Sequence, residues 1–272
     1  MQITKEYLSQ NVELFITHPE RFWEDATEIA ENAFYNFDSI IRENKEEYFF
    51  KEIEIPNTIS KIGANAFCDC DYLEKVVLPE NLKVIEPGTF KYCPSLKEVI
   101  LPSSLEEIGD EAFFECRLSE INFPENLTKI GKSAFTANDF ETITFPNNLT
   151  HIQEYTFERC PKLKEINFNN VKIIGKNAFS DCYNLTKIIL PETIDIVSSF
   201  AFCDCENLEY VEILNTNIKL GKQSFLNTKL VCMIQKNENT TILASTCSIL
   251  ETSKCTDLKD SIFKQIIEEV ED

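Results

Sequence analysis

Two pairs of cysteines have a spacing that could support chemistry. Residues 66–74 read AFCDCDYLE and residues 201–209 read AFCDCENLE, so one aspartate separates Cys68 from Cys70 and Cys203 from Cys205. Each pair resembles half of a site for a soft metal ion, or a redox-active pair of thiols. Because a structural zinc site needs about four ligands around one point, each pair would need further ligands from elsewhere in the chain.

Other catalytic signals are weak. The chain has two histidines, His18 and His151, which lie near neither cysteine pair in the sequence. It has no GxSxG, HExxH or phosphate-loop motif for nucleophilic, metal or nucleotide chemistry. A pair of carboxylates could serve a glycosidase, but no spacing among the acidic residues distinguishes one pair from the rest. We therefore expect no enzymatic activity, no metal and no cofactor.

The charge of the chain restricts its partners. The 272 residues include 26 basic and 46 acidic side chains, which give a net charge of −20. This charge disfavours nucleic acid, whose phosphates need basic contacts, and it disfavours anionic membrane surfaces. The acidic residues keep a large surface soluble and monomeric, or alternatively attract a basic partner.

The two ends of the sequence suggest a location. The first residues, MQITKEYLSQNVELF, lack the apolar run of ~7–15 residues that a signal peptide needs. No stretch approaches the ~18 apolar residues of a membrane span, and the final IIEEVED is not a lipidation motif. With eleven cysteines, an odd number, we expect reduced thiols in the cytoplasm rather than a disulfide framework. Export to the cell surface by an unrecognised route is the alternative.

A repeat of 22 or 23 residues organises most of the chain. A phenylalanine, usually in an Ala-Phe pair, marks each copy: Phe67, Phe90, Phe113, Phe135, Phe157, Phe179, Phe202 and Phe225. An outlying copy, IAENAF, ends at Phe34. A unit this short cannot bury its apolar face alone, so the copies must stack into a solenoid.

Further columns keep the same period. Three residues after the phenylalanine come Cys70, Cys93, Cys116, Cys160, Cys182 and Cys205, with Asn138 and Thr228 as exceptions. Four residues before it, glycine recurs at Gly63, Gly109, Gly131, Gly175 and Gly221, where it suits a tight bend. Runs such as LEKVVLP and LKEVILP alternate in polarity and end in proline, which predicts strands. The segment from the glycine to the cysteine predicts a short helical turn.

The pattern LxxIxLPxxLxxIGxxAFxxC, which covers roughly residues 50–232, resembles the leucine-rich repeats of BspA type. The resemblance implies an α/β fold, namely a right-handed solenoid with a parallel β-sheet on its concave face and short helical turns on its convex side. It also implies protein or matrix binding rather than catalysis. We therefore expect a protein-interaction module, or alternatively a surface-exported adhesin that binds host or matrix protein.

Both ends of the solenoid are expected to be capped. Residues 1–48 hold the degenerate repeat, with helix predicted around KEYLSQNVELF, and residues 49–232 form the solenoid. Residues 233–272 form a C-terminal cap, in which apolar residues from Leu258 to Val270 recur at helical spacing and predict an amphipathic capping helix. Capping is favoured over partner binding for this helix. Cys232, Cys247 and Cys255 lie outside the pattern and receive no role.

The repeat argues against a shared metal site. The two cysteine pairs are six repeats apart, and strands stack ~4.8 Å apart, so the pairs are roughly 29 Å apart. The recurrent cysteines are instead predicted to be small buried residues of a tight turn. Within each pair, at least one of the two thiols is expected to point outward.

Candidate binding residues follow from strand alternation, which turns every second side chain of a strand towards the concave surface. These candidates are Lys75, Val77, Glu98, Ile100, Asn122, Thr144, Asn167, Lys187, Ile189, Tyr210 and Glu212. Val77 and Ile100, on adjacent strands, are apolar where water is expected. One explanation is that β-branched side chains favour strands and have no further role here. Our hypothesis is that the two residues form a protein-binding patch flanked by Lys75 and Glu98.

Overall fold

The computed structural model describes the backbone of residues 1–44, 50–230, 232–237 and 240–244, and the side chains of residues 1–41 and 50–230. It divides into two compact units, residues 1–139 and residues 140–272, and each is described by itself. The expected amphipathic helix at residues 258–270 lies outside the described residues, as do Cys247 and Cys255.

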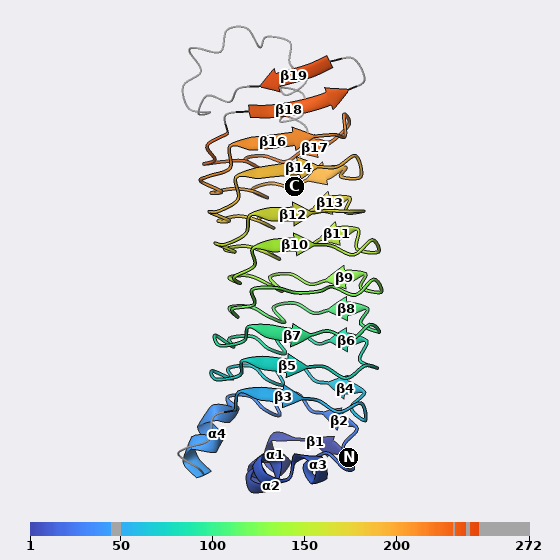
Figure 1. Cartoon of the computed structure of the whole chain (residues 1–272), viewed down its shortest axis with the longest axis vertical. Coiled ribbons are helices and arrows are strands. Elements are labelled where there is room, and N and C mark those ends of the chain that lie inside the picture. The colour runs from blue at the N-terminus through green and yellow to red at the C-terminus, as the bar shows by residue number, and fades with distance from the viewer. Residues whose placement is uncertain (45–49, 231, 238–239, 245–272) are drawn as a thin grey trace. The chain divides into compact units, whose positions relative to one another are not determined.

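The first unit consists of an N-terminal segment and stacked repeats with two strands each (Figure 1). The N-terminal segment contains β1 (Gln2–Ile3), α1 (Lys5–Gln10), α2 (Val12–Thr17), α3 (Pro19–Phe22), β2 (Glu28–Ile29) and α4 (Phe37–Asn44). The first column of strands is the parallel sheet of β3 (Glu52–Glu54), β5 (Lys75–Val77) and β7 (Glu98–Ile100). The second column is made of β4 (Lys61–Ile62), which pairs with β2 and through it β1, and of β6 (Val84–Ile85), β8 (Glu107–Ile108) and β9 (Lys129–Ile130).

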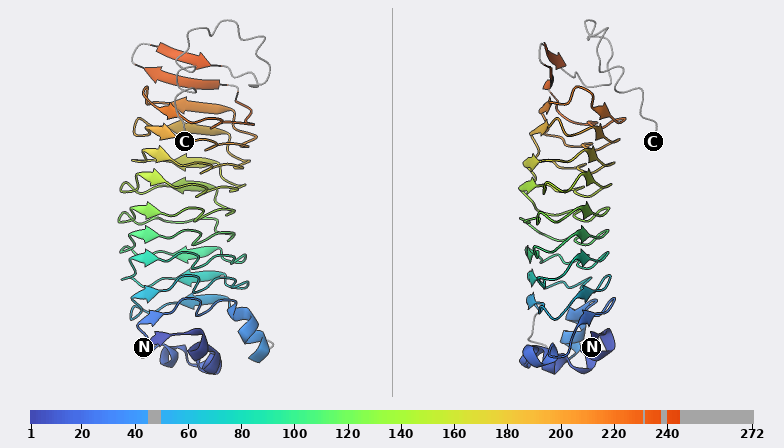
Figure 2. Two further views of the ribbon diagram at one scale, coloured as in Figure 1. Left: turned by 180° about the vertical axis from the view of Figure 1, so that it is seen from behind. Right: turned by 90° about the vertical axis from the view of Figure 1, so that its right-hand side faces the viewer.

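The second unit repeats this arrangement (Figure 2). Its first column contains β10 (Thr142–Thr144), β12 (Glu165–Asn167), β14 (Lys187–Leu190), β16 (Tyr210–Ile213), β18 (Cys232–Asn237) and β19 (Thr240–Ala244). Its second column is the sheet of β11 (His151–Ile152), β13 (Ile173–Ile174), β15 (Ile196–Val197) and β17 (Lys219–Leu220). All pairs are parallel except the last, β18 with β19. Consecutive copies of the repeat therefore become neighbouring rungs, as the sequence predicts.

The repeated phenylalanine forms a stack of rings inside each unit. In the first unit Phe67, Phe90 and Phe113 follow one another at centroid distances of 5.3 Å, with their planes 10° apart. Phe34 of the degenerate repeat stacks on Phe67 at 4.7 Å. The outlying copy is therefore a structural turn of the first unit, in register with the others.

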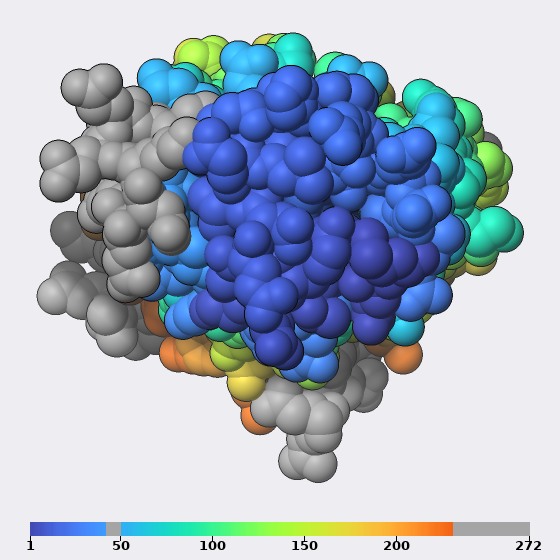
Figure 3. Space-filling view, turned by 90° about the horizontal axis from the view of Figure 1, so that it is seen from below, coloured from blue at the N-terminus to red at the C-terminus, as the bar shows by residue number. Residues whose placement is uncertain are grey.

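The predicted helix around residues 5–15 is present as α1 and α2, which are interrupted at Asn11. Figure 3 looks onto the end of the molecule at which this N-terminal segment, in blue, lies. The buried aromatic rings of Phe15, Phe22 and Trp23 pack against each other at 4.9–6.2 Å. Phe15 also contacts Phe34 at 5.6 Å and Phe50 at 5.7 Å, so the aromatic cluster of this segment is continuous with the ring stack of the first unit.

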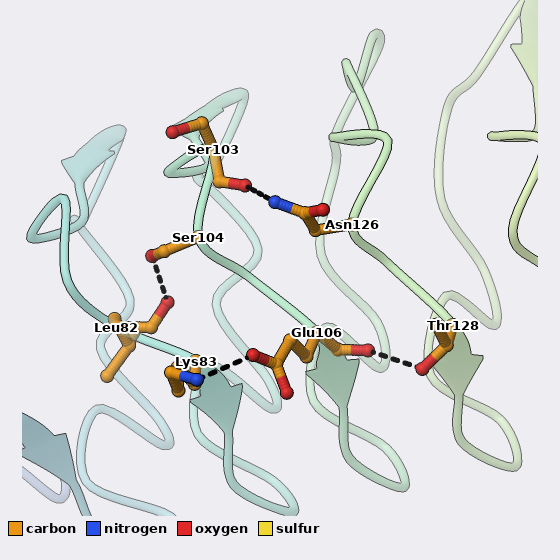
Figure 4. Close-up of polar contacts among 7 residues, drawn as sticks. All are labelled: Leu82, Lys83, Ser103, Ser104, Glu106, Asn126 and Thr128. Atoms are coloured by element: carbon orange, nitrogen blue, oxygen red, sulfur yellow. Dashed lines mark hydrogen bonds and ion pairs between the residues drawn. The ribbon is translucent and has the colours of Figure 1, made fainter.

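Polar side chains join successive turns of the first unit at its surface (Figure 4). In each contact, a side chain bonds to a residue of an adjacent turn, 22 or 23 residues away in the sequence. The pairs are Ser104 Oγ to Leu82 O at 2.7 Å, Asn126 Nδ2 to Ser103 O at 2.9 Å, Thr128 Oγ1 to Glu106 O at 3.2 Å, and Lys83 Nζ to Glu106 Oε1 at 2.7 Å. The first three bonds satisfy backbone carbonyl groups of the loops, and the fourth is an ion pair between side chains.

The segments between glycine and cysteine are consecutive hydrogen-bonded turns in the described repeats, where short helical turns were expected. Two residues in each turn have a positive φ, one two residues before the phenylalanine and one two residues after it; Asn65 (52°) and Asp69 (59°) flank Phe67. A left-handed residue breaks a right-handed helix. The turns also bond to each other, since Phe67 N donates to Thr89 O at 2.8 Å.

Because of this geometry, we expect glycine substitutions at two alanines of the same turn to change the stability of the protein in opposite directions. Ala137 has a φ of 60°, whereas Ala134 is buried and lies outside the left-handed region. A left-handed alanine costs about 1–2 kcal/mol, which glycine relieves against its own entropy cost of ~0.5–1 kcal/mol. We expect Ala137→Gly to raise the free energy of unfolding by roughly 0.5 kcal/mol and Ala134→Gly to lower it by about 1 kcal/mol. Urea unfolding followed by circular dichroism checks this, and shifts of the same sign would contradict it.

Candidate functional site

The recurrent cysteines are hydrogen-bond donors inside the turns. Cys93 Sγ donates to Phe67 O, and Cys116 Sγ donates to Phe90 O, both at 3.1 Å. In the second unit, Cys205 Sγ donates to Phe179 O at 3.1 Å. Each thiol thus satisfies a buried carbonyl of the preceding turn, which would otherwise be costly to leave unpaired.

Asn138 performs the same task with an amide. It is fully buried, and its Nδ2 donates to Phe113 O at 2.8 Å and to Phe135 O at 3.1 Å. Its Oδ1 accepts from Leu118 N at 3.0 Å. Asn138, which was expected to interrupt the cysteine column, therefore continues it. The position requires a small side chain that donates a hydrogen bond, and this need not be a thiol.

Cys68 and Cys203, which distinguish the two CDC stretches from other repeats, are also buried, as are Cys70 and Cys205. The expectation that one thiol of each pair points outward is therefore wrong. Cys203 Sγ donates to Asp204 Oδ2 at 3.0 Å. Within the described ranges, His, Cys, Asp and Glu side chains nowhere gather as a group of three that could hold a metal ion.

In the first unit, the structure brings four of the predicted binding residues together on β5 and β7. Val77 lies opposite Ile100 in the ladder, and Lys75 lies opposite Glu98. Lys75 Nζ and Glu98 Oε1 are 2.9 Å apart, and this hydrogen bond raises the pKa of Lys75. Val77 is half-buried, whereas 43% of Ile100 is exposed. We call these four residues the β5–β7 patch.

Asn122 is exposed, but it does not belong to a strand, and the first sheet of this unit ends at β7. Its repeat has only one residue between Cys116 and Leu118, whereas Cys93 and Leu96 are separated by two. Arg117 N in this loop donates to Leu96 O at 3.1 Å. The strand prediction around Asn122 is wrong, but loop length alone does not explain it, because the next repeat has the same shorter loop between Asn138 and Phe140 and still forms β10.

In the second unit, Thr144 and Asn167 are exposed and lie opposite each other on β10 and β12. Lys187 Nζ lies 4.8 Å from the ring centroid of Tyr210, a cation–π contact. Glu212 is only 9% exposed, although the strand pattern predicts a surface position. It lies on β16, which pairs with β14 and β18, and its Oε2 accepts a hydrogen bond from Tyr210 Oη at 3.4 Å.

A groove of about 660 Å³ opens on this face between β12 and β14. The ladder of β10 and β12 and the ladder of β14 and β16 are separate sheets, and the groove lies at their boundary. Ile189, 43% exposed, and Lys187 line it from β14, and Glu165 lines it from β12. Two of the predicted binding residues, Lys187 and Ile189, therefore line a groove that the alternation of side chains along the strands does not predict. We call it the β12–β14 groove.

Comparison with known proteins identifies the repeats. The model of the BspA type leucine rich repeat region matches six copies, over residues 22–140 and 128–248. The chain belongs to the BspA-type leucine-rich repeat family. No curated protein sequence matches it.

Solved leucine-rich repeat structures are similar to this chain. A leucine-rich repeat protein from Bacteroides ovatus ATCC 8483 is 29% identical with a TM-score of 0.60, over 78% of this chain and 60% of that one. A leucine-rich repeat protein from Eubacterium ventriosum ATCC 27560 shares the fold at 20% identity and a TM-score of 0.50, over 75% of this chain and 63% of that one. The chain therefore spans about 60% of the length of the Bacteroides ovatus protein.

Within this leucine-rich repeat framework Cys68 and Cys203 are poor nucleophiles. Burial, followed by the neighbouring Asp69 carboxylate, raises the pKa of Cys68 to about 12. Burial and Asp204 do the same for Cys203, also to about 12. A raised thiol pKa means that the thiolate becomes abundant only near that pH, so at neutral pH nearly every molecule carries the unreactive thiol.

We therefore expect Cys68 and Cys203 in the native protein to react with iodoacetamide at least about tenfold more slowly than free cysteine at pH 8. Mass spectrometry of peptides after timed alkylation measures each site. The same protein in urea, where burial is lost, should react at the rate of free cysteine. Rapid native labelling of either residue would contradict the assignment of a structural role.

Proposed function

We propose that this leucine-rich repeat chain is a non-catalytic protein-binding module that engages its partner through the sheet face of its first strand column. The exposure of Ile189 beside the β12–β14 groove carries the proposal. An apolar side chain next to a hollow can be desolvated by a complementary partner, and buried apolar anchors supply most of the affinity in protein interfaces. Lys187 and Glu165 provide the charged rim around it.

The β5–β7 patch repeats this chemistry in the first unit. Ile100 is as exposed as Ile189, and its flank is the Lys75–Glu98 ion pair. At Thr144 and Asn167 the equivalent column is polar. Within the second unit, these polar rungs provide matched controls for the apolar Ile189.

Affinity purification with mass spectrometry tests the proposal, with wild type, Ile189→Glu and Thr144→Glu as parallel baits. A charge placed at an interface anchor must be desolvated on binding, so Ile189→Glu should lose a partner that wild type and Thr144→Glu retain. Titration of that partner, once purified, should show at least about a tenfold weaker dissociation constant for Ile189→Glu. If both variants retain every partner, Ile189 serves strand propensity alone and the proposal fails.

A fourth bait, Val77→Glu with Ile100→Glu, tests the β5–β7 patch separately. Loss of the same partner would extend the interface to this patch. Unchanged capture would remove the β5–β7 patch from the proposal and leave the β12–β14 groove as the binding surface.

We also propose that the protein acts in the cytoplasm, as a monomer. The thiols that donate to phenylalanine carbonyls support this location, since a thiol must remain reduced to donate. The net charge of −20 supports the monomer by self-repulsion. Cell fractionation and protease treatment of intact cells test the location, and cleavage on intact cells would favour a surface adhesin instead. None of the described helices is long and apolar enough to span a membrane.

A further inference from the structure

The two strand columns of the first unit begin at different levels (Figure 1). In the second column β4 pairs with β2, and β2 pairs with β1. In the first column β3 is the first strand, and among the described residues it pairs only with β5. Among the residues that the structure describes, no strand lies beside β3 at the level of β2.

The sequence explains why this rung is missing. In the three two-stranded repeats of the first unit, the first strand begins nine residues before the second, as Glu52 precedes Lys61 and Lys75 precedes Val84. The same spacing counted back from Glu28, the start of β2, leads to Pro19, which is the first residue of α3. Proline cannot donate to a ladder but fits the first position of a helix. A short helix thus replaces the strand that would have covered the edge of β3.

A groove of about 600 Å³ lies along this edge. All three residues of β3 line it, and the opposite wall comes from α2 and α3. Phe15, Trp23 and Ile53, each nearly buried, give it an apolar floor. We call it the β3-edge groove.

The backbone of β3 is oriented for further pairing. Lys51 O accepts from Lys75 N at 3.1 Å and Ile55 N donates to Val77 O at 3.0 Å, so the odd-numbered residues face β5. In a parallel ladder alternate residues face opposite edges. The N–H and C=O groups of Glu52 and Glu54 therefore point away from β5, towards the side on which the groove lies.

The charged residues of the groove have one sign. Glu20 and Glu24 line one side and Glu52 and Glu54 the other, and all four are exposed. Like charges along a strand edge oppose pairing with a second copy of this chain, whose net charge is −20. The same charges attract a strand that carries lysine or arginine.

We propose that the β3-edge groove binds an extended, lysine- or arginine-bearing peptide segment of a partner protein, which adds to β3 as the missing rung. Backbone hydrogen bonds to Glu52 and Glu54 position the peptide. Its basic side chains meet the four glutamates, and its apolar side chains lie on the floor of the groove. The peptide would occupy the open edge of β3, whereas the function proposed above uses the face of the sheet, on which Glu52 and Glu54 lie opposite Lys75 and Val77.

The single tryptophan of the sequence, Trp23, lies in this groove and reports on its occupancy. The experiment titrates the full chain with a blocked octapeptide of alternating lysine and valine and records tryptophan fluorescence. We expect a saturable change that weakens with added salt. Glu52→Lys with Glu54→Lys should weaken binding on the order of tenfold or more. The matched control, Glu80→Lys with Glu120→Lys, changes the net charge equally at exposed sites outside the groove and should bind as wild type does.

Two further peptides distinguish strand addition from simple charge attraction. The same lysine–valine peptide with alternate backbone nitrogens methylated keeps its charges but cannot complete a ladder, and a glutamate–valine peptide reverses the charge. We expect neither to bind, and we expect Ile189→Glu to bind the lysine–valine peptide normally.

Four outcomes would overturn the proposal. They are no saturable change with the lysine–valine peptide, equal weakening in both charge-reversal variants, undiminished binding of the methylated peptide, and a tryptophan signal that changes with protein concentration alone. The last would assign the groove to a second copy of the chain. Circular dichroism confirms that each variant is folded.

Discussion

Replacing Phe179 by alanine is expected to lower the free energy of unfolding by about 3–5 kcal/mol. Its ring is fully buried between Phe157 and Phe202, at centroid distances of 5.5 Å and 5.3 Å. Phe168 meets it edge-on at 5.9 Å. The truncation leaves a cavity between turns that cannot close, because hydrogen bonds such as Phe179 N to Ala201 O, 2.8 Å, fix their spacing.

Urea unfolding followed by circular dichroism measures this loss, with Phe179→Leu and Tyr183→Ala beside it. Leucine keeps part of the ring volume and should lose less than half as much as alanine. Tyr183 lies four residues away on the same turn but is 41% exposed, so its truncation should change stability by no more than about 0.5 kcal/mol. Equal losses at Phe179 and Tyr183 would show that the ring stack contributes little.

The second large effect is expected at Gly109, where alanine should cost about 2–3 kcal/mol and valine more. A Cβ there would lie 2.6 Å from Pro87 N and 2.9 Å from Glu86 C, both backbone atoms of the preceding turn. Gly109 N also bonds to Ile85 O at 2.8 Å, so the two turns cannot separate without losing this bond.

Gly88 provides the control. It alone among the glycines has a positive φ, 64°, and the crowding atom is Asn65 Oδ1, the end of a flexible side chain. Asparagine tolerates this backbone region and occupies the equivalent position in other repeats, as at Asn177, so Gly88→Asn should cost less than about 1 kcal/mol. Thermal and urea unfolding of the two variants compare them. A larger loss at Gly88 than at Gly109 would contradict this explanation.

These two glycines also revise the interpretation of the glycine column. A tight bend was expected at Gly109 and its equivalents, but their φ angles lie outside the left-handed region. They are glycine because the backbone of the preceding turn approaches too closely for a Cβ. The recurrence was visible in the sequence, whereas the atom that excludes the side chain belongs to a turn about 22 residues away.

By itself, the sequence determined the solenoid, its rungs and its buried columns. A unit of 22 or 23 residues must place its phenylalanine, aliphatic and small donor residues in register with those of its neighbours, since no unit buries its apolar side alone. The pairing of Val77 with Ile100 and of Lys75 with Glu98 follows from that register.

Only the tertiary structure decided which of these rungs are continuous and which residues remain exposed. Glu212 is buried and Ile189 exposed, although both lie in the same column, because burial depends on the strands and loops on either side. Asn122 lies outside any strand although its column predicts one, and a helix that begins at Pro19 stands where β3 would have had its neighbour. Periodicity describes the average turn, whereas the β12–β14 groove and the β3-edge groove arise where adjacent turns differ.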